Sequence, residues 1–280
     1  MKYGAVYEEG YRRLSQHKIE NANLDARLLL ESICHTNRND LLAHADKEVS
    51  SEEYITYQQA IKKRAQHIPL QYITGSQEFM GLSFKVNDSV LIPRQDTEIL
   101  VEEAMLRLHD GMRILDMCTG SGCILLSLLH YSNDCIGTGV DISSEALAVA
   151  KTNAECLGIS AEFIQSDLFQ ELKNKDKFDM LVANPPYIQT SIVKDLMPEV
   201  KEHEPLIALD GKEDGLFFYR KIISECSIYL NGGALVLFEI GYDQGQQVKS
   251  LMESKGFLEV VVKKDLAGLD RVVAGTLVKG

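Results

Sequence analysis

The sequence lacks the features that would place the chain in or across a membrane. No stretch of its 280 residues approaches 18 uninterrupted apolar residues, the length needed to cross a bilayer. The opening segment MKYGAVYEEG carries charges and contains no apolar core of a secretory signal. We therefore expect a cytoplasmic protein that makes no membrane contact.

Cysteine is scarce, and its spacing does not match a metal site. The six cysteines form no C-x-x-C pair, and no histidine stands beside them at metal-ligand spacing. They are Cys34, Cys118, Cys123, Cys135, Cys156 and Cys226. We expect reduced cysteines that pack as small hydrophobic side chains, with neither a metal nor a disulfide.

Positive charge is also in short supply, and the deficit lies in one part of the chain. The formal net charge is −12, from 29 basic and 41 acidic residues. Residues 1–85 carry 11 of each kind, whereas residues 86–280 carry 18 basic and 30 acidic side chains. Such a surface repels a polyanion and suits a basic protein partner, so we expect no direct nucleic-acid binding.

Two different patterns divide the chain. Residues 1–67 show apolar residues at helical spacing, separated by short polar breaks, which predicts a small helical bundle. In the following segment, QEFMGLSFKV has Gly81 between two apolar runs and predicts a β-hairpin. We therefore expect a bundle at 1–67, a hairpin and linker at 68–95, and a larger domain at 96–280.

Strand and helix patterns alternate from Arg113 onward. The predicted strands cover residues 113–116, 135–140, 161–164, 178–183, 234–240, 257–262 and 271–278. Helical patterns lie between most of them, which is typical of a mostly parallel sheet with helices on both faces. The last two strands are close enough in sequence for an antiparallel hairpin. The expected fold class is α/β with a seven-stranded sheet.

The run RILDMCTGSGCILLSL places a loop of small residues between a strand and a helix. Gly120 and Gly122 let the backbone approach a ligand, and Asp141, which ends the next strand, can accept hydrogen bonds from both ribose hydroxyls. The loop does not have the G-x-G-x-x-G spacing that cradles a pyrophosphate. Asp116 at its mouth suits a cationic ligand, so the features together favour S-adenosylmethionine. The alternative for the loop taken alone is a plain glycine turn.

Two residues after the third predicted strand fit the same pocket. Asp167, in QSDLF, can accept a hydrogen bond from an adenine amino group, and Phe169 can cover the adenine ring. Each is weak evidence alone, because aspartate is common in exposed loops.

The segment FDMLVANPPYI ends a buried-looking strand directly in Asn184, Pro185, Pro186 and Tyr187. The two prolines fix the backbone and remove two N–H donors, which leaves the carbonyl groups free as acceptors. The Asn184 oxygen and the Pro185 carbonyl can then take the two hydrogens of a planar –NH2 group, against which Tyr187 can lie flat. This arrangement predicts methyl transfer to an amide or aromatic amine nitrogen. The alternative is a proline turn that ends the strand.

These residues resemble the HemK family, the release-factor glutamine methyltransferases, over nearly the whole chain. Beyond NPPYI, the matching stretches are PLQYITGSQEF, LIPRQDTE, LDMCTGSGCI, EPLIALDGKEDGL, FEIGYDQG and DLAGLDRVVAG. NPPY alone also occurs in DNA adenine and RNA guanine methyltransferases. The resemblance implies a class I (Rossmann-like) methyltransferase domain of seven strands, preceded by a helical bundle and a linking hairpin.

The resemblance further implies N5-methylation of the glutamine in the Gly-Gly-Gln motif of peptide-chain release factors, by an enzyme we expect to be monomeric. S-adenosyl-L-methionine is the implied cofactor and S-adenosyl-L-homocysteine the product. The glutamine site falls on Asn184, Pro185, Pro186 and Tyr187, and Asn184, Pro185 and Tyr187 are the expected catalytic residues. The residues implied for the cofactor are Cys118, Thr119, Gly120, Ser121, Gly122, Asp141, Phe169 and Asn184.

One residue departs from the family pattern, and one rival function shares the NPPY geometry. Cys118 stands where the family has its first loop glycine, which costs roughly 1–2 kcal/mol if that position requires a positive φ. The rival is an amino methyltransferase that acts on a flipped nucleic-acid base, adenine N6 or guanine N2. It would need a basic groove, which the charge distribution does not supply.

Overall fold

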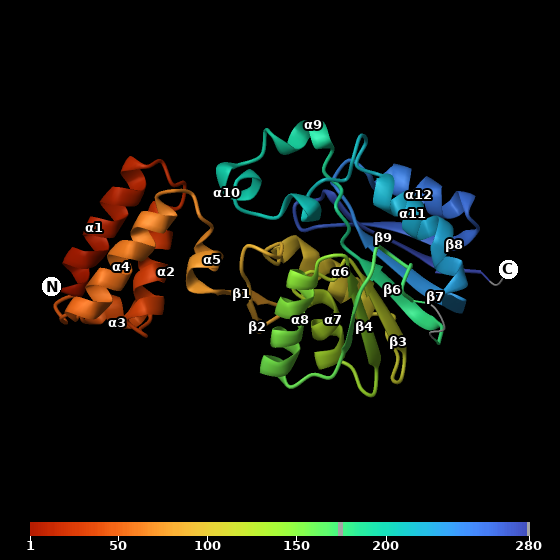
Figure 1. Ribbon diagram of the computed structural model, residues 1–280, viewed down its shortest axis with the longest axis horizontal. Helices are drawn as coiled ribbons and strands as arrows, with labels where there is room; N and C mark the ends of the chain where they lie inside the picture. The colour runs from red at the N-terminus through yellow and green to blue at the C-terminus, as the bar shows by residue number, and fades with distance from the viewer. Residues whose placement is uncertain (173–175, 279–280) are drawn as a thin grey trace. The chain divides into compact units, whose positions relative to one another are not determined.

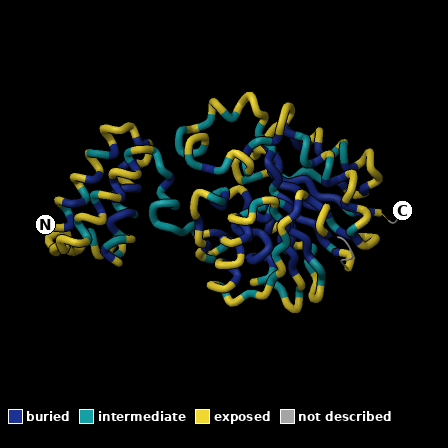
Figure 2. The backbone as a smooth tube through the Cα atoms, viewed as in Figure 1, coloured by how far each residue is buried: buried dark blue, intermediate teal, exposed yellow. Residues whose placement is uncertain are grey.

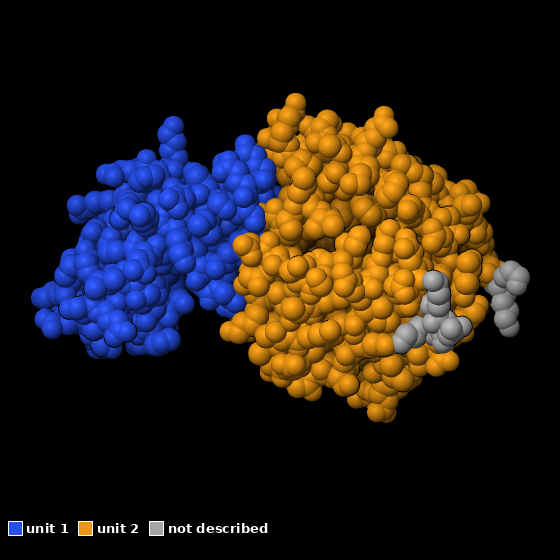
Figure 3. All heavy atoms as spheres, viewed as in Figure 1, with its two compact units in different colours: residues 1–76, 197–203 blue, residues 77–196, 204–280 orange. Residues whose placement is uncertain are grey.

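The structure is a computed structural model that describes residues 1–172 and 176–278. The chain forms two compact units, coloured separately in Figure 3. The first, here the helical unit, contains Met1–Ser76 and Met197–His203; the second, here the sheet unit, contains Gln77–Leu196 and Glu204–Gly280. No helix in the described part of the chain is long and apolar enough to cross a membrane.

The helical unit has one apolar core. Its helices are α1 (Tyr3–Gln16), α2 (Ala22–Ile33), α3 (Arg38–Ala43), α4 (Ser51–Arg64), α5 (Leu70–Thr74) and α10 (Pro198–Lys201). Leu14, Leu30 and Tyr57 are fully buried between α1, α2 and α4, and the buried stretches of these helices can be followed in Figure 2. Gly10 allows the close packing of α1 on α4, because a Cβ there would lie 2.0 Å from the Tyr57 hydroxyl.

A buried ion-pair network attaches residues 197–203 to this unit. The Arg64 guanidinium donates to Asp25 Oδ2 at 2.7 Å and to Glu199 Oε1 at 3.0 Å. The helical unit therefore includes two segments that the sequence analysis placed elsewhere: residues 68–76 were assigned to the linker and residues 197–203 to the larger domain.

The sheet unit is built on a seven-stranded sheet, formed by described residues in the order β5-β4-β3-β6-β7-β9-β8. The strands are β3 (Arg113–Met117), β4 (Ile136–Asp141), β5 (Glu162–Gln165), β6 (Phe178–Ala183), β7 (Leu230–Glu239), β8 (Phe257–Lys264) and β9 (Asp270–Leu277). The first five are parallel, and β9 runs antiparallel to both β7 and β8. The predicted α/β class, the seven strands and the antiparallel pair at the end of the chain are confirmed.

Helices cover both faces of this sheet (Figure 1). They are α6 (Gln95–Met105), α7 (Cys123–His130), α8 (Ser144–Leu157), α11 (Phe217–Glu225) and α12 (Gly245–Ser254), with short turns α9 (Thr190–Val193), η1 (Leu206–Ala208) and η2 (Cys226–Ile228). Alternate strand residues enter two apolar cores, one with α6 and α7 and the other with α11 and α12. Helix α6 begins at Gln95, directly after Arg94, so it starts where the predicted hairpin and linker at 68–95 ends.

The predicted hairpin is also present, as β1 (Ser76–Phe79) paired with β2 (Leu82–Lys85). Gly81 in its turn has φ +71°, a conformation that glycine adopts without strain. Because the central strands are parallel, their carboxyl ends meet at one edge of the sheet. The loops at this edge carry most of the residues that the sequence analysis selected.

Candidate active site

The loop between β3 and α7 has the backbone that its small residues suggest. Gly120 and Gly122 have φ of +55° and +79°, and Gly122 immediately precedes the first residue of α7. Cys118 also has a positive φ, +62°, although it carries a side chain. The structure therefore places a strained cysteine at the position where the family resemblance implies glycine.

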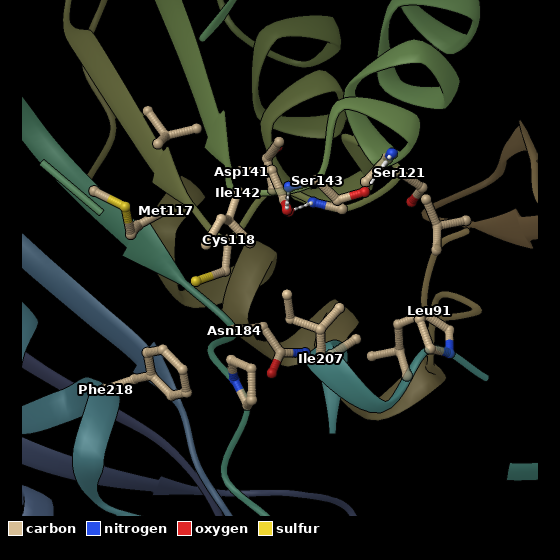
Figure 4. Close-up of a pocket in the computed structure, with 18 of the residues that line it drawn as sticks. Leu91, Met117, Cys118, Ser121, Asp141, Ile142, Ser143, Asn184, Ile207 and Phe218 are labelled. Atoms are coloured by element: carbon tan, nitrogen blue, oxygen red, sulfur yellow. Dashed lines mark hydrogen bonds between the residues drawn. The ribbon is translucent and has the colours of Figure 1, made fainter. Parts of the chain in front are cut away.

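A cavity of about 330 Å³ opens beside this loop, within the range of small-ligand sites. Cys118, Asp141 and Asn184 lie around the same hollow in Figure 4. Of the residues predicted to form the site, those that line the cavity are Cys118, Thr119, Gly120, Ser121, Asp141, Asp167, Asn184 and Pro186. The structure thus brings the ends of β3, β4 and β6 together around one space.

Asp141 ends β4 and is held by two backbone donors. Gly120 N donates to its Oδ2 and Ser143 N to its Oδ1, both at 2.9 Å. Burial raises the pKa of the carboxyl, and these backbone hydrogen bonds oppose the rise. The hydrogen bond from Gly120 links Asp141 to the glycine loop, so the two features that were predicted to bind the cofactor form one continuous wall of the cavity.

Asn184 follows β6 without an intervening residue. Its side-chain Nδ2 lies 3.4 Å from Thr97 Oγ1 in the first turn of α6, and both residues line the cavity. Pro185 and Pro186 are buried, and only Pro186 is part of the cavity wall. The polar end of Asn184 is therefore the part of the NPPY segment that is exposed to a ligand in this cavity.

Tyr187 is turned away from the cavity, unlike the prediction that it lies flat against a ligand there. Its hydroxyl donates to Glu239 Oε1 at 3.3 Å, and its carbonyl accepts from Gln244 Nε2 at 3.0 Å. Burial, followed by the neighbouring Glu239, raises the pKa of the phenol. In this structure Tyr187 anchors the loop that carries Asn184.

Two other predicted residues lie away from the cavity surface. Phe169 is 1% exposed and stacks on Tyr229 with ring centroids 4.7 Å apart, while its neighbours Asp167 and Leu168 line the cavity. Gly122 lies behind the loop, where a Cβ would come within 3.2 Å of the Ala150 and Leu126 side chains. Phe169 thus packs in the core instead of covering a ligand.

The prediction that Asp116 lies at the mouth of the loop is wrong. It is fully buried beneath the loop and accepts a hydrogen bond of 2.6 Å from the Thr119 hydroxyl. Burial raises its pKa to about 7, while the hydrogen bonds from Thr119 and from the Leu125 backbone lower it. Asp116 therefore stabilises the loop from within and is not the mouth of the site.

The segment 204–216 contributes a wall that residue-by-residue reasoning missed. Its Pro205, Ile207, Ala208 and Lys212 line the cavity. Ile188 N donates to Leu209 O at 3.0 Å, and Gly211 N donates to Ile188 O at 2.7 Å, so the segment pairs with the chain leaving NPPY.

An ion pair holds the start of this segment. Arg94 Nη2 lies 2.7 and 2.6 Å from the two carboxylate oxygens of Glu204, whose side chain is almost completely buried. Arg94 belongs to LIPRQDTE and Glu204 to EPLIALDGKEDGL, two of the stretches that resemble the family, and the ion pair brings them together. Among the described residues, no group of three or more histidine, cysteine, aspartate or glutamate side chains could hold a metal ion.

Comparisons with known proteins agree with this architecture. Residues 5–75 match the PrmC N-terminal domain, and residues 95–201 match the methyltransferase small domain. A methyltransferase structure from Pyrococcus furiosus is similar with a TM-score of 0.52 at 16% identity, covering 71% of this chain and 90% of that one, which shows the fold alone. The seven-stranded sheet and the methyltransferase domain define a class I, Rossmann-like methyltransferase.

Two relatives identify the family. The chain is 40% identical over 271 residues to the release factor glutamine methyltransferase of Geobacter sulfurreducens, covering 97% of this chain and 94% of that protein. It is 44% identical over 268 residues to the protein of the same name from Moorella thermoacetica, covering 94% of each. The chain belongs to the release factor glutamine methyltransferase family, as its motifs indicated.

Proposed function

We propose that this protein transfers a methyl group from S-adenosyl-L-methionine to the side-chain amide nitrogen, N5, of the glutamine in the Gly-Gly-Gln motif of peptide-chain release factors. The observation that carries the proposal is the position of Asn184, at the end of β6 and in the wall of the cavity that Asp141 also lines. The names of the two relatives supply the substrate class.

The cavity fits the proposed cofactor by the chemistry of its walls. Asp141 and Asp167 provide acceptors, and Leu91, Val140 and Ile142 are among the apolar residues that surround them. Carboxylates and apolar walls suit an adenosine bearing a positive charge better than they suit phosphates. When bound, the cofactor supplies a methyl group on a positively charged sulfur. The residues proposed to hold it are Cys118, Thr119, Gly120, Ser121, Asp141 and Asn184, with Gly122 shaping the loop.

The proposed role of Asn184 follows from the weak nucleophilicity of an amide nitrogen, whose lone pair is delocalised. Asn184 Oδ1 and the Pro185 carbonyl accept the two amide hydrogens, which favours positive charge on nitrogen as the new N–C bond forms. The sulfur keeps the electron pair of the broken S–C bond, and the methylated nitrogen then releases one proton to solvent. Pro186 and Tyr187 hold this loop in place.

The helical unit is proposed to bind the body of the release factor. A single glutamine offers little surface, so discrimination must use contacts remote from the reacting nitrogen. A surface groove of this unit is lined by Tyr7, Leu24, Arg27, Leu42 and others, and Leu42 is 72% exposed. We infer a monomeric enzyme that acts in the cytoplasm, where its substrate is used.

The test is incubation with isotopically labelled cofactor and purified release factor, followed by peptide mass mapping. We expect one methyl group on the Gly-Gly-Gln glutamine, and none on a release factor whose glutamine is replaced by alanine. Single-stranded DNA and RNA serve as the competing substrates. Methylation of either nucleic acid, with the release factor unmodified, would contradict the proposal.

A further inference from the structure

The Asn184 amide has two ends, and only one of them suits the reaction. If the Asn184 oxygen points at the substrate, it accepts a hydrogen bond from the substrate NH2 group. If the Asn184 amide is rotated by 180°, its own NH2 group faces the substrate NH2 group, and two donors cannot form a hydrogen bond. In the structure Nδ2 faces Thr97 Oγ1 at 3.4 Å, which leaves Oδ1 as the free end. The hydroxyl of Thr97 is therefore the group that distinguishes the two orientations.

A threonine hydroxyl can itself donate or accept, so its own proton must be directed elsewhere. Glu239, the last residue of β7, is 1% exposed and provides that acceptor. Burial raises the pKa of Glu239 to about 7, while hydrogen bonds from the hydroxyls of Thr97 and Tyr187 and the positive charge of the Arg271 guanidinium lower it. Above pH 7 Glu239 is mostly ionised and can only accept, so it turns the Thr97 proton away from Asn184.

The backbone around Asn184 is fixed independently, which leaves the side-chain amide as the variable to be set. Gln244 donates to the carbonyls of Tyr187 and Gly215 at 3.0 and 3.3 Å, and its own oxygen accepts from Gly241 N at 3.0 Å. Gly215 has φ +73°, and a Cβ there would come within 2.3 Å of the Tyr187 carbonyl oxygen. The FEIGYDQG segment thus supports the NPPY loop through both Glu239 and Gln244.

We propose that Thr97 and Glu239 are positioning residues, which orient the Asn184 amide so that its oxygen faces the substrate nitrogen. The hydrogen-bond chain runs from Asn184 Nδ2 to the Thr97 hydroxyl and from there to the Glu239 carboxylate. Glu239 also holds the Tyr187 hydroxyl, so one buried acid fixes both polar side chains of the NPPY segment. This inference rests on the proposed function, because it assigns the amide orientation that the methyl transfer needs.

The central experiment replaces Thr97 by valine, which keeps the shape and removes the hydroxyl, and by serine, which restores the hydroxyl. For Thr97→Val we expect kcat for release-factor methylation to fall about 10- to 100-fold, less than the loss of a direct catalytic acceptor. KM for the release factor and the cofactor Kd should stay within about twofold, because binding in the ground state is little affected. Thr97→Ser should recover most of kcat.

Two further variants separate positioning from a general loss of structure. Thr138→Val is the matched control, since Thr138 is a buried threonine of β4 whose hydroxyl also donates to a glutamate, Glu162, at 3.4 Å. It should leave kcat unchanged. In an Asn184→Ala background, adding Thr97→Val should have little further effect, because Thr97 acts through the residue already removed.

The outcomes are distinguishable from failure of the proposed function. If the parent protein does not methylate release factor, the proposed function is wrong and the positioning roles fall with it, because they concern the orientation that this transfer needs. If the parent is active and Thr97→Val keeps full kcat, the positioning proposal is wrong. Fully additive losses in the double variant would also overturn it, because they would place Thr97 in direct contact with substrate. If Thr97→Val does not fold, Glu239→Gln provides the same comparison, with an expected fall in kcat and an unchanged cofactor Kd.

Discussion

Cys118 offers a test of the backbone of the cofactor loop. Its φ of +62° belongs to the left-handed region, which costs a residue with a side chain about 1–2 kcal/mol relative to glycine. A glycine at this position offsets roughly 0.5–1 kcal/mol of that gain, because the unfolded chain has more conformational freedom with glycine than with another residue. Cys118→Gly removes the strain. Cys118→Ala removes the thiol but keeps the backbone strain, because alanine still has a Cβ.

We therefore expect the glycine variant to be more stable than the alanine variant by about 1 kcal/mol, which is about 2–4 °C in Tm for a domain of roughly this size. This is the reverse of the usual ranking of the two residues. Cofactor Kd for the glycine variant should stay within about threefold of the parent value, because strain present with and without ligand cancels in the binding free energy.

Urea denaturation of the two variants measures the difference. Cys123 supplies the control, because it begins α7 a few residues later and has no positive φ. There we expect alanine to be more stable than glycine by about 0.5–1 kcal/mol. If alanine were also the more stable replacement at Cys118, the loop would not be strained at that position and the reasoning would fail.

Four other predictions address the site and the substrate. Asn184→Ala should lower kcat about 10²–10³-fold with a small change in cofactor Kd; near-normal turnover would remove Asn184 from the chemistry. Asp141→Ala should weaken cofactor binding by about 2–4 kcal/mol, and calorimetry that finds unchanged affinity would refute the ribose assignment. Leu24→Asp combined with Leu42→Asp should raise KM for intact release factor about tenfold and leave activity on a short Gly-Gly-Gln peptide unchanged, since about 1.4 kcal/mol of apolar contact is lost. An unchanged KM would place the contact elsewhere. Burial raises the pKa of Glu239 to about 7, so its protonated form favours the folded state, and that contribution is lost as pH rises from about 4.5 through 7. The unfolding free energy of the parent should therefore fall over this range relative to Glu239→Gln, and parallel pH curves would contradict the assignment.

The parts of the site that could be predicted from the sequence are those encoded by local spacing. A strand that runs directly into Asn184 must place it at the carboxyl edge of the sheet, and the same holds for Asp141 after β4. The glycine pattern likewise predicted a loop whose backbone approaches a ligand site, and Gly120 lines the cavity. In each case one or two neighbouring residues determine the geometry, so no knowledge of distant contacts was needed.

The parts that were missed depend on which direction a side chain takes and on contacts between distant segments. Asp116 belongs to a buried strand position, and its burial under Thr119 cannot be read from its sequence neighbours. Phe169 and Leu168 are adjacent and both buried, but Phe169 stacks on Tyr229 and only Leu168 lines the cavity, a difference that depends on this distant contact. The pair of Arg94 and Glu204 joins residues 110 positions apart.

The structure also separates the work of chemistry from the work of recognition. Asn184, Thr97 and Glu239 can orient a planar amide, but they would treat any accessible glutamine alike, since nothing in that contact reads the surrounding protein. Selectivity must therefore come from surface outside the cavity, and binding energy gained there can be used to hold the glutamine where transfer is fast. The acidic surplus of residues 86–280 favours basic sequences around the glutamine. A glutamine on an acidic loop would meet the same catalytic groups and would still be a poor substrate.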